Sequence, residues 1–138
     1  VCTLLILASL SLVSANSITE YGKTSFDSEI SIVKPNAHVY IFNIQIAPLP
    51  GQGRFNAIVI GMVNVQVDVG NTSVDKVEFY VDNELKENDT EAPYEWMWDE
   101  RMIVPPIHSL KVVGYDNDVE VGSDEIRLLY INPFLFRP

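Results

Sequence analysis

Residues 77–84 read VEFYVDNE and carry the clearest structural signal in this 138-residue chain. Val77, Phe79 and Val81 alternate with more polar neighbours, so a strand here can bury one face and leave the other in water. Asp82 and Asn83, which follow, tolerate the positive φ angles of a tight hairpin turn. The stretch therefore predicts a half-buried β-strand that leads directly into a β-hairpin.

The same two-residue period recurs on both sides of this stretch. It is strictest at 63–69 (VNVQVDV), where a helix would scatter the four valines around its circumference. Four more segments are predicted strands: 39–46, 94–98, 109–115 and 125–131. Turn-forming residues separate the strands at spacings of roughly 8 to 15 residues, which is typical of antiparallel sandwiches and barrels. No window of comparable length shows an amphipathic helical repeat, so the predicted fold class is all-β.

Several short motifs add a family resemblance to this pattern. They are VEFYVD at 77–82, Asp89-Thr90, Ala92-Pro93-Tyr94, Trp98-Asp99, His108, Leu110 and Tyr115-Asp116. In this order they resemble the bacterial and archaeal immunoglobulin-like domains of secreted and surface proteins, and the archaeal members most closely. The resemblance covers residues 31–132. It implies an immunoglobulin-like antiparallel β-sandwich of about seven strands, and it implies no catalytic residue.

The N-terminal segment indicates export. Residues 1–15 are uncharged and mostly apolar, and Val13 and Ala15 are small residues of the kind that signal peptidase prefers. We therefore expect a signal peptide whose start is missing, with Asn16 as the new N-terminus after cleavage. A buried strand or short helix and a membrane anchor are the alternatives, although an anchor normally needs about 20 apolar residues. The expected organisation is a signal at 1–15, a polar lead-in at 16–30, the sandwich at 31–132, and a tail or the start of a next module at 133–138.

Charge and cysteine content limit the partners and sites. The chain has 9 Lys and Arg against 19 Asp and Glu, a formal charge of −10. Such a surface repels phosphate backbones and anionic lipid, so no nucleic-acid or membrane contact is expected of the mature domain. The only cysteine, Cys2, lies in the expected signal, which leaves no thiolate pair for a disulfide or a metal. A protein or polysaccharide at the cell surface is the expected partner.

Acidic residues gather at and after the end of the predicted strand 109–115. They are Asp116, Asp118, Glu120, Asp124 and Glu125. Carboxylate oxygens are the ligands that Ca²⁺ takes, which makes the first four of them calcium candidates. Their spacing does not match an EF-hand loop, and acidic residues at the end of a sandwich are commonly only solvated. The sequence therefore predicts no cofactor.

Aromatic side chains invite a sugar-binding interpretation. Tyr94, Trp96 and Trp98 share one face of their predicted strand, and a row of rings can stack on sugars. The competing interpretation places these rings in the core, with the intervening residues outside. Trp98 is predicted to be a core residue, whereas Trp96 is a ligand candidate. Tyr80, on the polar face of its strand, is a second ligand candidate.

Two glycosylation sequons fall in predicted turns. Asn71-Thr72-Ser73 and Asn88-Asp89-Thr90 both match the acceptor pattern, so Asn71 and Asn88 are candidates for surface glycosylation in a host with the machinery.

Enzyme chemistry finds no motif in this sequence. There is no nucleophile elbow, metalloprotease helix, phosphate-binding glycine loop or paired-cysteine motif. His108 is interpreted as structural because a lone histidine lacks the nucleophile and orienting group that a catalytic site needs. The chain is therefore expected to be a noncatalytic module, secreted or at the cell surface, that acts as a spacer or an adhesive domain. The alternative is a substrate-binding or carbohydrate-binding accessory domain of a secreted hydrolase.

Overall fold

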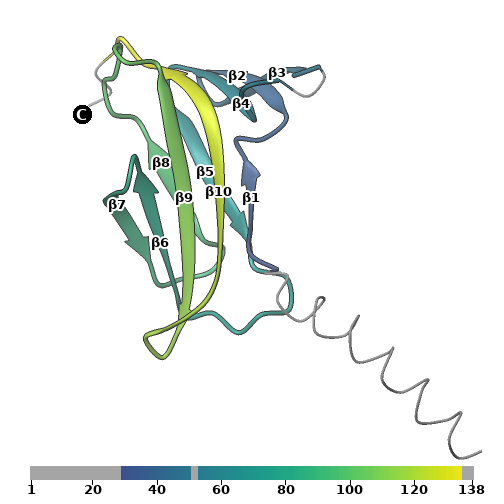
Figure 1. Cartoon of the computed structure of the whole chain (residues 1–138), viewed down its shortest axis with the longest axis vertical. Coiled ribbons are helices and arrows are strands. Elements are labelled where there is room, and N and C mark those ends of the chain that lie inside the picture. Colours follow the sequence, from purple (N-terminus) through teal and green to yellow (C-terminus); the bar gives the residue numbers. More distant parts are fainter. Residues whose placement is uncertain (1–28, 51–52, 135–138) are drawn as a thin grey trace, which may run out of the picture.

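The computed structural model describes residues 29–50 and 53–134, which form ten β-strands and no helix (Figure 1). The strands are β1 (Ser31–Lys34), β2 (His38–Ile41), β3 (Ile44–Pro48), β4 (Ala57–Ile60), β5 (Val63–Asp68), β6 (Lys76–Val81), β7 (Glu84–Asp89), β8 (Glu95–Trp98), β9 (Ile107–Asp116) and β10 (Val119–Ile131). The expected signal at 1–15, most of the lead-in and the last four residues of the tail lie outside the described residues.

The strands form two sheets that face each other. One has the order β1-β5-β8 and the other the order β3-β2-β4-β10-β9-β6-β7. Neighbouring strands pair antiparallel, except that β4 runs parallel to both β2 and β10. In Figure 1, β9 and β10 run the length of the molecule, while β2 and β3 project at one end. The predicted all-β sandwich is confirmed, with ten strands rather than about seven and with one strand, β4, parallel to its neighbours.

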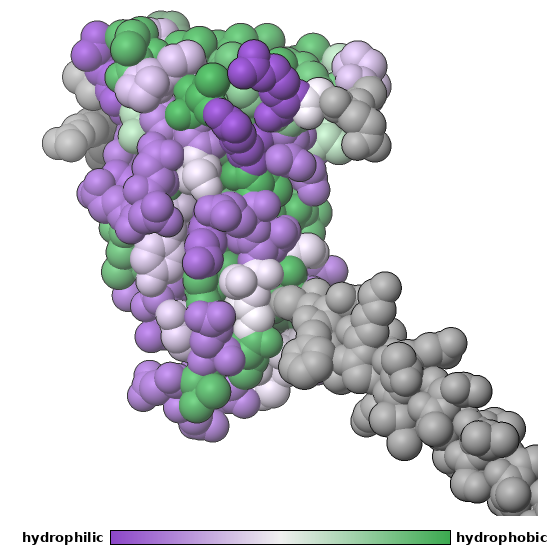
Figure 2. Space-filling view, in the orientation of Figure 1, coloured by the Kyte–Doolittle hydropathy of each residue, from purple (hydrophilic) through white to green (hydrophobic). Residues whose placement is uncertain are grey.

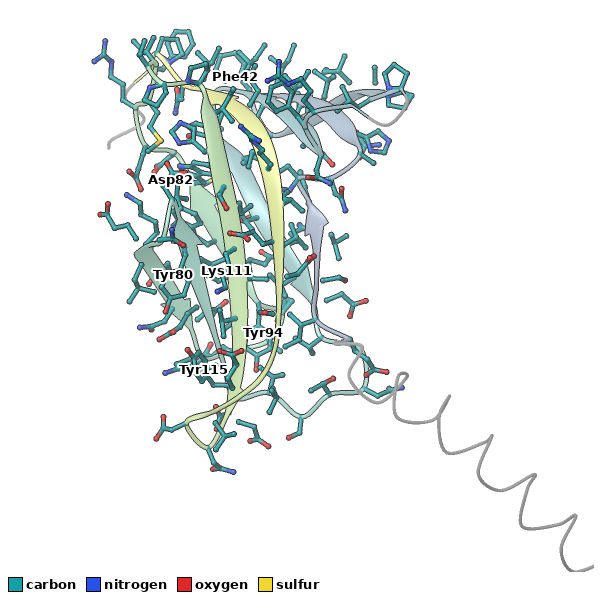
Figure 3. All side chains as sticks on the ribbon, in the orientation of Figure 1. Phe42, Tyr80, Asp82, Tyr94, Lys111 and Tyr115 are labelled. Carbon is teal, nitrogen blue, oxygen red and sulfur yellow. The ribbon has the colours of Figure 1, made fainter. Side chains whose placement is uncertain are left out.

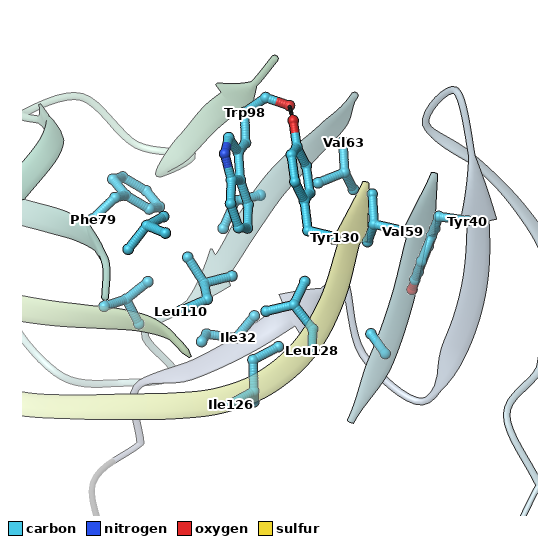
Figure 4. Close-up of a cluster of buried hydrophobic side chains, with 14 of the residues drawn as sticks. Ile32, Tyr40, Val59, Val63, Phe79, Trp98, Leu110, Ile126, Leu128 and Tyr130 are labelled. Carbon is cyan, nitrogen blue, oxygen red and sulfur yellow. Dashed lines mark hydrogen bonds between the residues drawn. The ribbon is translucent and has the colours of Figure 1, made fainter. Parts of the chain in front are cut away.

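The hydrophobic core lies between the two sheets (Figure 4). Val77, Phe79 and Val81 form the buried face of β6, as their alternation predicts, and Val63 and Val65 do the same on β5. Burial of one such side chain contributes roughly 1.5 to 3 kcal/mol. Further core residues come from the other strands: Ile32, Tyr40, Val59, Trp98, Leu110, Val112, Leu128 and Tyr130.

Three hairpins close with two-residue turns in which both residues have positive φ. The turn Asp82-Asn83 has φ values of 51° and 69°, and Asn117-Asp118 has 52° and 65°. Two consecutive positive φ values match the right-handed twist of the flanking strands, and Asn and Asp adopt them at low cost. The hairpin predicted after Val81 is thus confirmed.

One predicted strand, 39–46, is wrong because a third hairpin turn divides it. Phe42 and Asn43 adopt φ values of 49° and 69°, so β2 ends at Ile41 and β3 begins at Ile44. The apolar run around Asn43 conceals the turn, since Phe42 is not a turn-forming residue. The sequence pattern does not predict strands β1, β4 and β7. Central β4 is apolar at every position and β7 is almost entirely polar, so neither shows an alternating pattern.

Candidate functional site

Three aromatic rings stack in a column that runs from the edge of the sandwich into its core. The Trp98 and Tyr130 rings are parallel, with centroids 3.9 Å apart and an interplanar angle of 3°. Trp96 stacks on the other side of Trp98 at 5.7 Å and 15°. Trp98 has no exposed surface, so its predicted place in the core is confirmed (Figure 4).

The Tyr130 hydroxyl fastens this column to the end of β8. Its single O–H is shared between the backbone oxygens of Trp98, at 3.2 Å, and Glu100, at 3.0 Å. Burial raises the pKa of Tyr130 well above its ordinary value, so the hydroxyl stays a donor. Nearby, the Asn132 amide donates to the Asp99 backbone oxygen at 3.0 Å. The rings and their polar ends therefore hold the two sheets together.

Trp96 is half-buried and lines a shallow hollow of about 340 Å³ where β7 and β8 approach each other. Its ring also contacts Phe79, at 6.0 Å between centroids, so Trp98 and Phe79 limit the ring surface left for a ligand. The rim of the hollow is mostly acidic and consists of Glu87, Asn88, Asp89, Glu95 and Met97. Carboxylates and an amide beside an aromatic ring could hydrogen-bond the hydroxyls of a neutral sugar.

The Asp89 side chain shapes this rim. Its Oδ2 accepts the Glu95 backbone N–H at 3.0 Å, and its Oδ1 accepts that of Glu91 at 3.1 Å. Glu95 in turn accepts a hydrogen bond from the Asn64 amide at 3.1 Å. The side chains at the hollow are thus partly held in place by the module itself.

Tyr80 lies on the outer face of the larger sheet and is already engaged (Figure 3). Its hydroxyl donates to Glu78 Oε1 at 2.6 Å, while Lys76 lies 3.5 Å from Glu78 Oε2. The hydrogen bond from Tyr80 lowers the pKa of Glu78 and raises the pKa of Tyr80 above its ordinary value. The Lys76 ammonium also sits over the Tyr115 ring, 4.7 Å from its centroid. This network orders the outer face and occupies the Tyr80 hydroxyl.

His108 is 4% exposed and is held by the β6–β7 turn. Its Nδ1 lies 2.7 Å from Asp82 Oδ2, and Asp82 Oδ1 accepts the Ser109 backbone N–H at 2.9 Å. Partial burial would raise the pKa of the Asp82 carboxyl, but the His108 ring and the Ser109 N–H outweigh burial. The pKa of Asp82 therefore lies below its ordinary value.

The geometry around His108 does not resemble a nucleophile and its base. The Ser109 hydroxyl donates to Glu125 Oε2 at 2.6 Å, on the opposite strand face from the imidazole. His108 Nε2 is buried and has no hydrogen-bond partner among the described residues. The Trp98 ring lies edge-on to the imidazole at 6.1 Å. The structural interpretation of His108 agrees with these contacts, and sequence reasoning missed its Asp82 partner, 26 residues away.

The calcium candidates do not converge. Asp116 and Glu120 flank the β9–β10 turn, which contains Asp118, whereas Asp124 accepts the Ile32 backbone N–H at 2.8 Å and so ties β10 to β1. Within residues 29–50 and 53–134, no group of three or more acidic, His or Cys side chains could hold a metal ion. Asp124 therefore serves a contact between strands, and the carboxylates at the β9–β10 turn contribute to the polar surface.

Both glycosylation candidates are exposed, but only one lies in a turn. Asn71 follows β5 in the predicted turn, and its backbone N–H donates to Glu29 at 2.6 Å. Asn88 belongs to β7, an end strand of the larger sheet, so its predicted turn position is wrong. The polar sequence around Asn88 indicated a turn because an exposed end strand carries no apolar period.

Comparison with one group of solved modules supports the fold seen here. The fibronectin(III)-like modules of Clostridium thermocellum CbhA match with a TM-score of 0.50 and 20% identity, over 75% of this chain and 46% of that one. The chain thus spans less than half of that structure, and the likeness concerns the fold. Bacteroides uniformis beta-glucuronidase matches with a TM-score of 0.45 and 12% identity, over 78% of this chain and 11% of that one. No curated protein sequence matches significantly.

A family model supplies the remaining comparison. The model described as "Bacterial Ig domain" matches residues 55–125, just over half of the chain. Modules of this kind typically occur in extracellular proteins and typically carry no catalysis of their own. Among the described residues, no helix has the length and hydropathy needed to cross a bilayer. By its fold and by this match, the chain belongs to the bacterial Ig domain family.

Proposed function

We propose that this chain is a noncatalytic module of a secreted or cell-surface protein, where it acts as a structural spacer or an adhesive domain. The observation that carries the proposal is that the aromatic rings and the imidazole best suited to binding or catalysis are already packed inside the module. Trp98 and Tyr130 belong to the aromatic column. His108 is buried against that column, and its Nδ1 lies 2.7 Å from Asp82 Oδ2. The groups that could stack or transfer protons are thus engaged in the packing of the sandwich itself.

The proposal is tested by assaying the purified 138-residue chain for hydrolysis of glycosides, esters and peptides. We expect no turnover above a heat-denatured control. Hydrolysis that His108→Ala abolishes in a folded variant would contradict the proposal, since it would show that the buried imidazole takes part in chemistry. A partner protein or polysaccharide at the cell surface is the expected contact of the module.

A second candidate function is an accessory domain of a secreted hydrolase that binds carbohydrate. Its support is the hollow beside Trp96, where a half-buried ring lies among Glu95, Asp89 and Asn88. Tryptophan fluorescence is the natural probe, because a sugar stacked on Trp96 would change the emission of that ring. We expect any shift on adding a polysaccharide series to disappear in Trp96→Ala and to persist in Met97→Ala, which changes the same rim. A glycan array and titration without any ligand would remove this candidate and leave the spacer.

A further inference from the structure

The strand at one end of the larger sheet, β3, is exposed along its whole length. All five residues from Ile44 to Pro48 are exposed, including Ile44 at 63% and Ile46 at 56%. An end strand presents backbone N–H and C=O groups that another strand can pair with. The strand at the other end, β7, is protected in the usual way, because four of its six residues carry a charge.

The surroundings of β3 are apolar as well. Phe42 and Ile60 are also exposed, at the tip of the β2–β3 hairpin and at the end of β4. Figure 2 shows polar residues over most of the visible face and apolar residues gathered at the end where Figure 1 places these strands. Soluble monomers rarely keep a large contiguous apolar surface without a use for it.

Charge sets the same region apart. Residues 30–67 contain no Asp or Glu and only two full positive charges, Lys34 and Arg54, while the whole chain carries −10. Two copies of the protein therefore repel each other over most of their surfaces but not through the β2–β3 hairpin. The hairpin also precedes the family match at 55–125, so it belongs to the part of this chain that the match leaves out.

We propose that the β2–β3 hairpin is a self-association surface, on which β3 pairs antiparallel with β3 of a second copy and joins the two seven-stranded sheets. Antiparallel pairing of like strands is two-fold symmetric, so each copy offers the same edge and receives the same edge. Ile44 and Ile46 of one copy then meet the apolar hairpin of the other. A second copy fits this edge because the β2–β3 hairpin carries no carboxylate, so the contact sets no acidic side chains of the two hairpins against each other.

The test is the mass of the full 138-residue chain in solution, measured by light scattering and sedimentation from micromolar to near-millimolar concentration. We expect a concentration-dependent dimer, and we expect the double variant Ile44→Lys, Ile46→Lys to weaken it by about tenfold or more, because pairing would set the ammonium groups of the two copies beside one another on the same face of the joined sheet. Leu85→Lys on β7 is the matched control, since Leu85 is 47% exposed on the opposite end strand, and it should leave the dimer unchanged.

Amide hydrogen exchange provides a second readout that needs no substitution. In the wild-type chain, the backbone amides of residues 44–47 should exchange more slowly as the concentration rises, while those of β7 should not change. A monomer at every concentration overturns the proposal. So does a dimer that survives the double lysine substitution, one that Leu85→Lys dissolves equally, or exchange in β3 that is independent of concentration.

Discussion

Among single residues, Trp98 is the largest fully buried side chain in the described part of the molecule. Trp98→Ala should lower the free energy of unfolding by about 3 to 5 kcal/mol, because it removes the centre of the aromatic column and leaves a cavity. Glu95→Ala, on the exposed face of the same strand, should change it by less than about 0.5 kcal/mol. Urea denaturation of both variants measures this. Small, equal losses would show that the faces of β8 are assigned wrongly.

A second prediction for a single residue concerns Asp82 and the dependence of folding stability on pH. Its pKa in the folded protein lies below the ordinary value, so its contribution to stability is fully present above about pH 4 and is lost as the pH falls through the lower folded-state value. Asp82→Asn keeps a residue that tolerates the positive φ of the turn but removes the charge beside His108. Chemical denaturation over a series of acidic pH values should show a shallower loss of stability in the variant. Parallel curves would mean that the Asp82–His108 contact does not contribute to folding stability.

At the scale of an element, Gly61 decides how β4 connects to β5. Its φ is 89°, and a Cβ added there would lie 2.8 Å from the Phe42 ring. Gly61→Ala should therefore destabilise the fold by about 1 to 3 kcal/mol. Gly53→Ala is the matched control, since its Cβ would come no nearer than 3.8 Å to any described residue other than its chain neighbours. The two substitutions should separate clearly in thermal unfolding, and a tolerated Gly61→Ala would show that the connection adjusts freely.

The elements also show which strands a sequence pattern can reveal. Strands β5 and β6 have one buried and one wetter face, and that contrast is what alternation records. Strand β4 lies between two parallel neighbours, while β7 lies at the end of the sheet with only Lys86 and Asp89 half-buried. In neither strand do polar and apolar side chains alternate between the two faces. For this reason a search for alternation does not find β4 or β7.

At the scale of the whole molecule, the charge of −10 predicts that the chain does not bind nucleic acid. Duplex DNA carries a dense row of phosphates that the acidic chain repels. Adding the chain should therefore not change the electrophoretic mobility of the DNA, even at low salt, where electrostatic binding is strongest. Lys34 and Arg54 are the basic residues of the acid-free stretch 30–67, so the variant in which both are alanine shows whether that stretch contributes to any binding. Any shift at low salt would contradict the prediction, and its loss in the double alanine variant would assign the binding to this stretch.

Local chemistry, read from the sequence, determined the β class, the turn at Asp82-Asn83 and the inward face that holds Trp98. Each of these depends on residues within a few positions of one another, because strand pleat and turn dihedrals are properties of neighbouring peptides. The tertiary structure decided the contacts across the sandwich: Asp82 with His108, 26 residues apart, and Trp98 with Tyr130, 32 residues apart. It also decided that β3 ends its sheet, and so which apolar residues stay exposed. Strand order depends on the packing of the whole core, and no short window of sequence contains that information.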